Sequence, residues 1–206
     1  MSEEVIRTVD ELRDLVGHPL PRTRDKVTDR LDDIHRQWLE HTPFVVLATA
    51  GSDGRTDASP KGDPPGQLVH VIDERTVALA ERPGNRRVDG YLNVLDNPHA
   101  GLVCIIPGRG DTLRINGRAR LVRDAPWFDE MVVKGHRPLL ALVVDVEEVF
   151  FHCAKAFMRS RMWHPQEWDP TAVSSRAEIA KLLERPDETI EALEDYYGSQ
   201  YSTGLY

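Results

Sequence analysis

The chain has 206 residues, of which 40% are hydrophobic and 29% are charged, a composition typical of a folded globular protein and not of a disordered one. Its 34 acidic residues outnumber 26 lysines and arginines, which gives a net charge of −8 and argues against a nucleic acid partner. No apolar run approaches the roughly 20 residues of a membrane span, and the acidic start lacks the pattern of a secretory signal. We therefore expect a cytoplasmic protein that binds neither nucleic acid nor membrane.

The first forty residues predict two helices. Thr8 followed by Glu11 is a capping-box pattern, and Gly17 ends the short helix that this pattern starts. A second helix is expected over residues 25–40. Its apolar residues recur at helical spacing and are Val27, Leu31, Ile34 and Trp38. Such a stripe needs a surface to cover it, so we expect these helices to pack on the rest of the protein.

After residue 42 the pattern changes to strands joined by tight turns. The expected strands are residues 44–50, a strand towards residue 59, 67–72, 76–80, 100–106, 113–122 and 139–151. Helical segments are expected at residues 85–95, 125–134, 154–161 and 174–197, the last with an apolar face of Ile179, Leu182 and Leu183. The short connections favour antiparallel hairpins, so this order predicts a mainly β protein with α additions, an antiparallel barrel rather than a doubly wound sheet.

Residues 81–95 are the most informative segment for function. Asn85 is a good helix N-cap, which places Arg86 and Arg87 in the first turn. The apolar stripe expected to follow is Val88, Leu92 and Leu95. Each positive charge there opposes the helix dipole by about 0.3–1 kcal/mol, whereas a bound anion reverses the sign. Backbone N–H groups and two guanidinium groups would hold a phosphate well. The alternative is a solvated helix start, with arginines paired to Glu81 or Asp89.

A second candidate is the proline- and glycine-rich stretch of residues 57–66. A strand is expected to end there in a rigid turn, because Pro60 fixes the backbone before Lys61 and Gly62 frees it afterwards. Such a turn could present backbone groups to a flat heterocycle, with Lys61 supplying charge. The alternative is a simple loop with an exposed lysine.

Two basic faces are further candidates for anion binding. Alternation along residues 113–122 places Arg114, Arg118 and Arg120 on one strand face, which from spacing alone is more typical of a solvated exterior. Lys155 and Arg159 are four residues apart on a helix and point the same way. That helix could contact an anion or a partner subunit, or be an interface helix with no ligand.

Other site chemistries lack their motifs. The eight histidines include no pair at HExxH spacing, and the sequence contains no GxSxG, GxxxxGK[ST] or GxGxxG motif. Cys104 lies in an apolar run typical of a core. Cys153 follows His152 in a strand, where neighbouring side chains point to opposite faces. We therefore expect neither a metal site nor a cysteine nucleophile.

In their order along the chain, the strings SPKGD, ERPGNRRVDGYLNVLDNP and FHCAKAFMRSRMW resemble the pyridoxamine 5'-phosphate oxidase-like flavoproteins. More narrowly, they are similar to a bacterial branch of FMN-binding members, over roughly residues 25–168. This resemblance implies a six-stranded split barrel with N- and C-terminal helices. It also implies a homodimer with two FMN sites at the subunit interface.

The resemblance also implies roles for individual residues. Those expected to line the flavin ring and ribityl chain are Ser59, Pro60 and Lys61. Those expected to hold the phosphate are Asn85, Arg86 and Arg87. Arg114 would face the flavin from the neighbouring strand. The residues that could reach the site from the second subunit are Lys155, Arg159 and Ser160.

These expectations divide the chain into N-terminal helices (1–41), an FMN-binding split-barrel domain (42–170) and a C-terminal helical extension (171–206). Authentic pyridoxamine phosphate oxidases end in a basic segment that grips the substrate, whereas this sequence ends in GSQYSTGLY, a loose or docking tail. We therefore expect an FMN-dependent oxidoreductase of another small substrate. The alternatives are a deazaflavin or haem ligand in the same fold, or a non-catalytic flavin-binding or sensing module. No residue is an obvious acid or base, which suits a flavin enzyme.

Overall fold

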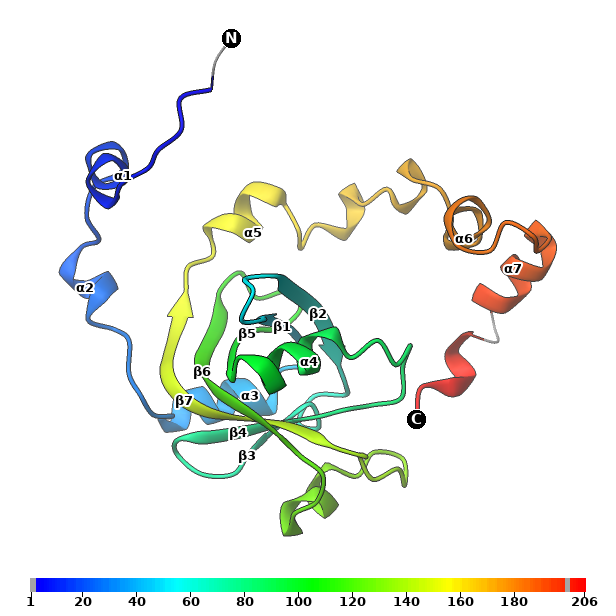
Figure 1. Ribbon diagram of the computed structural model, residues 1–206, viewed down its shortest axis with the longest axis horizontal. Helices are drawn as coiled ribbons and strands as arrows, with labels where there is room; N and C mark the ends of the chain where they lie inside the picture. The colour runs from blue at the N-terminus through cyan, green and yellow to red at the C-terminus, as the bar shows by residue number, and fades with distance from the viewer. Residues whose placement is uncertain (1–2, 199–200) are drawn as a thin grey trace.

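The computed structural model describes residues 3–198 and 201–206, and its centre is one antiparallel sheet (Figure 1). Its seven strands are β1 (Phe44–Ala50), β2 (Thr56–Gly62), β3 (Val69–Val71), β4 (Thr76–Ala80), β5 (His99–Ile105), β6 (Thr112–Val122) and β7 (Ala141–His152). Their order is β2-β1-β5-β6-β7-β4-β3. The strands expected from the residue pattern are confirmed, but the sheet has one more than the six implied by the resemblance. In the described residues β2 and β3 are its edges and do not pair with each other.

The main core lies on one face of this sheet, where hydrophobic side chains alternate with more exposed ones along β1 and β6. A smaller cluster, with Phe128 and Met131 of η1, covers the opposite face of β4 and β7, which are buried on both sides there. Val45 and Leu47 on β1 are fully buried, as are Leu113 and Ile115 on β6. Burying each such side chain stabilises the fold by about 1.5–3 kcal/mol. The opposite face of β6 carries the three arginines, of which Arg118 and Arg120 are exposed. The exterior expected for this arginine row is confirmed for those two residues.

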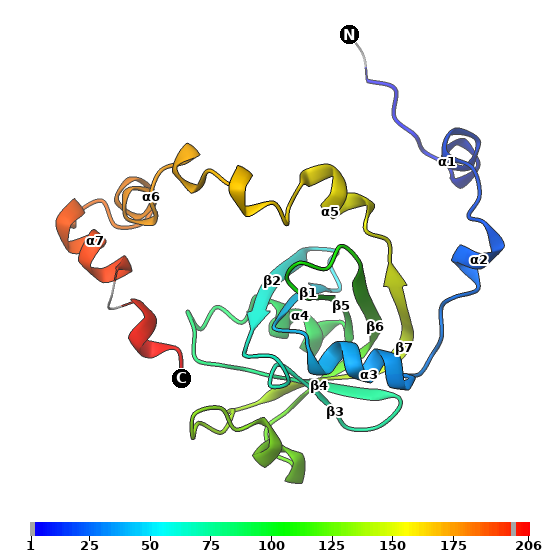
Figure 2. The same cartoon turned by 180° about the vertical axis from the view of Figure 1, so that it is seen from behind.

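The N-terminal region contains three helices, of which one packs on the sheet. The capping box of α1 (Val9–Val16) is present as expected, but neither α1 nor α2 (Pro21–Arg24) buries a residue. Helix α3 (Asp33–Glu40) buries three, which are His35, Trp38 and Leu39. The N-terminal arm, α1 with α2, extends away from the sheet (Figures 1 and 2).

The helix expected over residues 25–40 is wrong in its first half. Thr28 N donates to Val149 O at 3.1 Å, and Val149 N donates to Thr28 O at 2.7 Å. This isolated antiparallel bridge requires extended backbone at Thr28. The helix therefore starts only after Asp32. Of the expected stripe, Leu31 and Trp38 are buried, whereas Ile34 is 55% exposed.

Two further helical expectations are corrected. Residues 125–134 form only a short 3-10 helix, η1 (Pro126–Met131), which buries Phe128 and Met131. Residues 174–197 form two helices, α6 (Arg176–Leu183) and α7 (Ile190–Tyr197). The face between α6 and α7 consists of Ala177, Ala180 and Leu193, whereas Leu182 and Leu183 are exposed. The interruption at Pro186 explains the change, because proline in a helix interior removes a hydrogen bond and clashes with the preceding turn.

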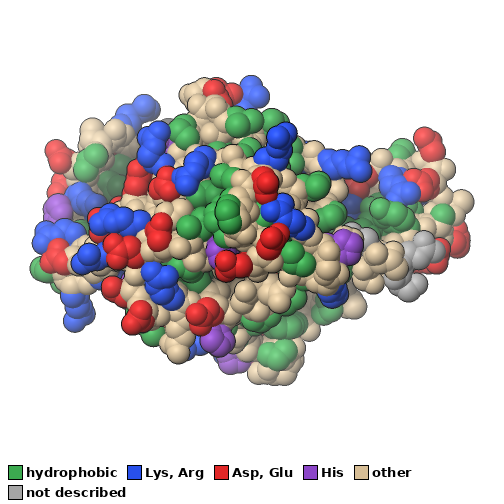
Figure 3. All heavy atoms as spheres, turned by 90° about the horizontal axis from the view of Figure 1, so that it is seen from below, with side chains coloured by type: hydrophobic (Ala, Val, Ile, Leu, Met, Phe, Trp, Pro, Cys, Tyr) green, Lys and Arg blue, Asp and Glu red, His purple; other side chains and the backbone are tan. Residues whose placement is uncertain are grey.

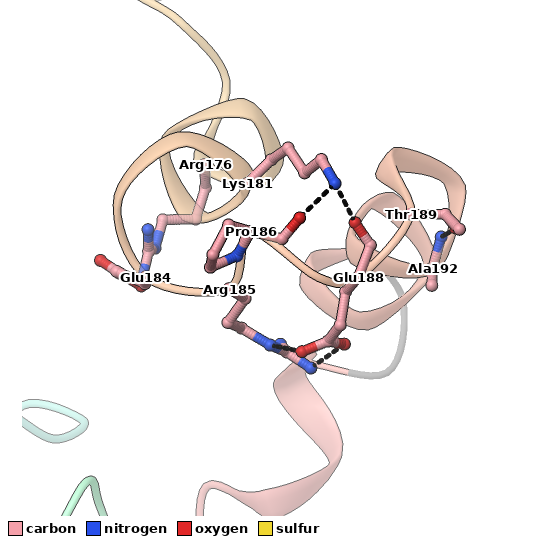
Figure 4. A network of polar contacts seen from close by, with 8 residues as sticks. All are labelled: Arg176, Lys181, Glu184, Arg185, Pro186, Glu188, Thr189 and Ala192. Atoms are coloured by element: carbon pink, nitrogen blue, oxygen red, sulfur yellow. Dashed lines mark hydrogen bonds and ion pairs between the residues drawn. The ribbon is translucent and has the colours of Figure 1, made fainter.

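The connection between α6 and α7 is held by polar contacts (Figure 4). Lys181 Nζ donates to the carbonyl oxygens of Pro186 and Glu188, each at 2.6 Å. Arg185 makes a two-pronged ion pair with Glu188. Together with α5 (Lys155–Ser160), these helices arch over the sheet, and the end of the chain returns to it (Figures 1 and 2). Of the expected tail, residues 199–200 lie outside the described residues.

The helices described for residues 3–198 and 201–206 have at most eight residues. A helix needs about 20 residues to span a bilayer. None of the described helices is therefore long and apolar enough to do so.

Gly117 lets β6 and β7 stay in contact where their register shifts. The shift falls between Asn116 and Gly117, and a Cβ at Gly117 would lie 2.0 Å from the carbonyl oxygen of Asp145. No side chain fits there without separating the strands. A β-bulge of this kind bends the strand that carries it.

We expect Gly117→Ala to destabilise the protein by about 1–3 kcal/mol, because the added methyl group forces backbone movement in the longest strand pair. Urea denaturation monitored by circular dichroism would measure the loss. Gly62→Ala is the control, since a Cβ there would meet Pro43 O at an ordinary 3.6 Å. Equal stability of the two variants would contradict this account.

Candidate functional site

A cavity of about 470 Å³ lies between β2, the end of β4 and the start of α4 (Asp89–Asp96). It is lined by residues 57–62, Leu68 and residues 80–91. Six of the ten residues expected at a cofactor site line it, namely Ser59, Pro60, Lys61, Asn85, Arg86 and Arg87. Two segments about 25 residues apart in sequence are thus brought together at one pocket.

Strand β2 forms one wall and is longer than expected. It continues to Gly62 by pairing Lys61 with Val45 and Gly62 with Phe44, so the turn expected at residues 60–62 is wrong. Pro60 is tolerated because β2 is an edge strand. Alternation leaves Ser59 and Lys61 half-buried on one face and Pro60 exposed on the other.

A carboxylate that the sequence analysis did not select, Glu81, holds Lys61 in place. Lys61 Nζ lies 2.8 Å from Glu81 Oε2, and the hydroxyl of Tyr91 donates to the same oxygen at 2.5 Å. The ammonium also lies 4.5 Å from the centroid of the Tyr91 ring. The Lys61 and Glu81 side chains are only 18% and 22% exposed. Each charge therefore compensates the other in a partly dehydrated site.

Tyr91 is the most buried member of this group, at 3% exposure. Burial, together with the hydrogen bond to the Glu81 carboxylate, raises the pKa of the Tyr91 hydroxyl above its ordinary value. The hydroxyl therefore stays protonated at neutral pH and acts as a hydrogen-bond donor.

The loop before α4 corrects the helix expected from Asn85. The Asn85 side-chain oxygen accepts from Arg87 N at 3.0 Å, which makes a local turn instead of a helix cap. Arg86 and Val88 have φ values of 62° and 50°, in the left-handed region that does not continue a right-handed helix. Arg86 and Arg87 consequently lie in a loop, and α4 begins at Asp89.

Positive φ is uncommon for arginine and a clear outlier for valine. Backbone strain of this kind costs about 1–3 kcal/mol at each residue and clusters at functional sites. Two such residues in one loop, Arg86 and Val88, therefore give residues 85–88 a backbone conformation that is locally unfavourable.

Helix α4 also presents a different face to the core than expected. Its buried residues are Gly90, Tyr91 and Val94, whereas Val88, Leu92 and Leu95 are exposed. A Cβ at Gly90 would lie 3.0 Å from Asp57 Oδ2, so glycine allows α4 to approach β2 closely. This approach places Tyr91 beside Lys61.

The two arginines of the loop differ in their partners. Arg87 pairs with Asp89 at 2.7 Å and its side chain is 74% exposed, so the alternative pairing considered for it is the one observed. Arg86 makes no ion pair within the part of the chain that the structure describes.

Arg82 is a further basic residue of the pocket wall that the sequence analysis did not select. Its Nε donates to Asp63 Oδ2 at 2.6 Å and its Nη2 donates to Met131 O at 2.9 Å. Its Nη1 is buried without a hydrogen-bond partner among the described residues. Glu81 and Arg82 directly precede the PGNRR string. Their opposite charges at the end of an apolar strand were the signal that could have found them.

Four expected site residues do not line this pocket. Arg114 lies on β6, two strands away from β1, and its guanidinium is 5.0 Å from the Phe150 ring. The other three are exposed on α5 and are Lys155, Arg159 and Ser160. Their expected role depends on a second subunit and stays a prediction.

Sequence comparison gives the family of the chain. The family model described as pyridoxamine 5'-phosphate oxidase matches residues 31–153, which is more than half of the sequence and includes every residue of the pocket wall. The chain belongs to the pyridoxamine 5'-phosphate oxidase family. A comparison with curated proteins gives no significant match.

Several solved structures are similar to this family member. HupZ of group A Streptococcus aligns with a TM-score of 0.47 and 15% identity, over 59% of this chain and 93% of its own. A candidate pyridoxamine 5'-phosphate oxidase of Lactobacillus delbrueckii aligns with a TM-score of 0.46 and 22% identity, over 60% of this chain and 95% of its own. PhzG of Burkholderia lata, in complex with tetrahydrophenazine-1-carboxylic acid, aligns with a TM-score of 0.43 and 17% identity, over 66% of this chain and 85% of its own. Each alignment leaves about a third or more of this chain unmatched.

The raised pKa of Tyr91 predicts a pH dependence of stability. In the unfolded chain a tyrosine ionises near pH 10. Above that pH the unfolded state loses a proton that the folded state keeps, so the stability that Tyr91 contributes is complete below about pH 10 and falls as the pH rises further. The free energy of unfolding of wild type relative to Tyr91→Phe is therefore expected to stay constant up to about pH 9 and to decrease as the pH rises above about pH 10. Urea denaturation of both proteins would measure it, and a constant difference would contradict the burial of this hydroxyl.

Proposed function

We propose that this chain is an FMN-dependent oxidoreductase that acts on a small substrate. The observation that carries the proposal is the gathering of Lys61, Arg82, Arg86 and Arg87 at one cavity in a protein of net charge −8. Three acidic residues, Asp57, Glu81 and Asp89, line the same cavity, so its four basic residues leave a net charge of +1 on the lining. Basic and acidic side chains are likewise interspersed on the face seen in Figure 3. Family membership supports a flavin as the ligand of this cavity.

The residues of the pocket fit the phosphate of FMN. Arg86 and Arg87 line the cavity, and Arg86 has no ion-pair partner among the described residues. A phosphate accepts several charge-assisted hydrogen bonds, preferably from guanidinium groups. The cavity of about 470 Å³ is also within the roughly 300–1,000 Å³ of small-molecule sites.

The remainder of the pocket suits the flavin ring. Pro60 and Leu68 supply apolar surface, and the Tyr91 hydroxyl and Lys61 ammonium are held by Glu81. When bound, the flavin itself supplies the redox chemistry. The protein would contribute the Lys61–Glu81 ion pair, whose positive end at Lys61 would stabilise the reduced, anionic ring.

We also propose the split barrel that the family resemblance implies and the cytoplasmic location expected from the composition. Cys104 is buried and Cys153 is exposed, and both are free thiols. Free thiols are typical of reducing compartments, which supports the cytoplasm.

The phosphate role of the loop arginines is tested by titration with FMN and with riboflavin, which lacks the phosphate. We expect Arg86→Ala to lower the affinity for FMN by roughly ten- to a hundredfold, because one charge-assisted hydrogen bond is lost. The affinity for riboflavin should stay nearly unchanged. Arg87→Ala should have a smaller effect of about tenfold or less, because Arg87 is exposed and must first leave Asp89.

Two controls accompany this experiment. Lys61→Ala should weaken both ligands, because Lys61 lies on the ring side of the pocket. Arg118→Ala, on the exposed face of β6, should weaken neither. If Arg86→Ala and Arg87→Ala lower the affinity for riboflavin and FMN equally, the loop does not bind the phosphate. The visible spectrum of each complex, before and after anaerobic NADPH, separates a redox enzyme from a binding module.

We further propose that the protein is a homodimer with shared sites. Helices α1, α2 and α5 bury no residue within this chain. Val9, Leu15 and Met158 on these helices are 72%, 72% and 71% exposed. Exposed apolar residues on neighbouring helices favour contact with a second copy of the chain. Such contact would bring Lys155 and Arg159 of α5 towards the pocket of that second copy.

Light scattering should therefore give about twice the chain mass of 23.3 kDa. Replacing Leu15 and Val9 together by glutamate should shift the equilibrium towards monomer, because charge replaces the exposed apolar surface of α1. A monomer that binds one FMN per chain with wild-type affinity would overturn the shared site.

A further inference from the structure

The C-terminal segment of the chain docks beside the pocket. Both ribbon views place its end next to the loop before α4 (Figures 1 and 2). The Tyr206 hydroxyl donates to Asp63 Oδ1 at 2.8 Å. Its ring centroid lies 5.0 Å from Lys134 Nζ and 5.9 Å from the Arg82 guanidinium carbon. The ring therefore lies near two cations, and such contacts favour an aromatic side chain.

Asp63 connects Tyr206 to the pocket wall. Its side chain is 0% exposed, and one carboxylate oxygen accepts from Tyr206 while the other accepts from Arg82 Nε. A buried carboxylate is costly unless hydrogen bonds satisfy both oxygens. Loss of the tyrosine hydroxyl would leave Oδ1 without this donor, and the carboxylate could then turn or admit water. Either change would release the partner that orients Arg82.

Arg82 is the member of this chain of contacts that reaches the cavity. Asp63 and Met131 O hold two of its three nitrogens, and the third, Nη1, has no partner among the described residues. A guanidinium is planar, so fixing Nε and Nη2 also fixes the direction of Nη1. The geometry of this donor thus depends on Asp63, and through it on Tyr206.

We propose that Tyr206 is a positioning residue for the ligand site, which orients Arg82 through Asp63 and so keeps the part of the cavity wall that Arg82 forms in the shape that binds the ligand. The C-terminal segment is then a wall of the pocket, although 143 residues separate Tyr206 from Asp63. This inference rests on the proposed FMN site for the identity of the ligand. The contacts that carry it do not depend on that identity.

The experiment compares full-length wild type with Tyr206→Phe, which removes the hydroxyl and keeps the ring. Tyr201→Phe is the matched control, because Tyr201 lies in the same segment and contacts Tyr196 and Tyr197 instead. FMN affinity is measured by quenching of flavin fluorescence, and backbone hydrogen exchange is measured on the ligand-free proteins. We expect Tyr206→Phe to weaken FMN about three- to tenfold, the effect of one hydrogen bond, and to speed exchange in residues 81–88. Tyr201→Phe should change neither.

A double-mutant cycle tests whether Tyr206 acts through Arg82. Arg82→Lys keeps a positive charge beside Asp63 and removes the planar guanidinium. On this background Tyr206→Phe should have no further effect on FMN affinity. An equal additional loss would show that Tyr206 acts independently of Arg82 and would overturn the proposal, as would wild-type affinity and exchange in Tyr206→Phe alone.

The two measurements separate this inference from the proposed function. If wild type binds no FMN, the proposed function fails, and hydrogen exchange in residues 81–88 still decides whether Tyr206 orders the pocket wall. If wild type binds FMN and Tyr206→Phe matches it in both affinity and exchange, the cofactor assignment stands and the positioning role fails.

Discussion

The pocket depends on one shared carboxylate oxygen. Glu81 leaves the end of β4 and accepts from Lys61 of β2 and from Tyr91 of α4, so three separate elements converge on a single atom. A carboxylate with two donors is well satisfied despite its partial burial, and it fixes the spacing of the elements that supply them. Without this contact the edge strand β2 would carry an unpaired lysine, and α4 would have no polar link to it through Tyr91.

The loop of residues 85–88, next to the Glu81 contacts, is strained. Glu81 and Arg82 are held by short polar contacts, whereas residues 85–88 adopt left-handed conformations at two non-glycine positions. A ligand that binds the loop N–H groups and guanidinium groups would return part of this cost. The held residues Glu81 and Arg82 thus lie next to a strained, charged loop, residues 85–88, an arrangement better suited to binding a ligand than to stabilising the fold.

Local sequence signals explain what could be predicted. The hairpins, the capping box at Thr8 and the alternation on β6 all depend on residues close together in the chain. The predictions that are wrong concern segments whose conformation depends on contacts beyond the local pattern. Thr28 is extended because Val149, far along the chain, pairs with it. Asn85 resembles a helix cap, but its side chain bonds Arg87 N and moves the helix start to Asp89. That delay turns a different face of α4 inward.

The candidate site shows the same division. Lys61, Arg86 and Arg87 could be selected because their strings are distinctive, and the structure brings them to one cavity. Glu81, Arg82 and Tyr91 lie in one of the same strings, but their roles depend on contacts across the fold that the string does not reveal. The link between Tyr206 and Asp63 spans 143 residues and has no local signal at all.

Pro60 has a consequence beyond the pocket that it lines. Strand β2 ends the sheet, and an open edge offers unpaired backbone groups on which another chain could add a strand and begin to aggregate. Proline supplies no N–H at that position, so an added strand would lack a hydrogen-bond donor there. The SPKG sequence can thus keep the edge accessible to a small ligand while it discourages β-pairing between molecules. Pro60→Val would lower the solubility of the protein, because the edge would then offer a longer run of backbone groups for pairing.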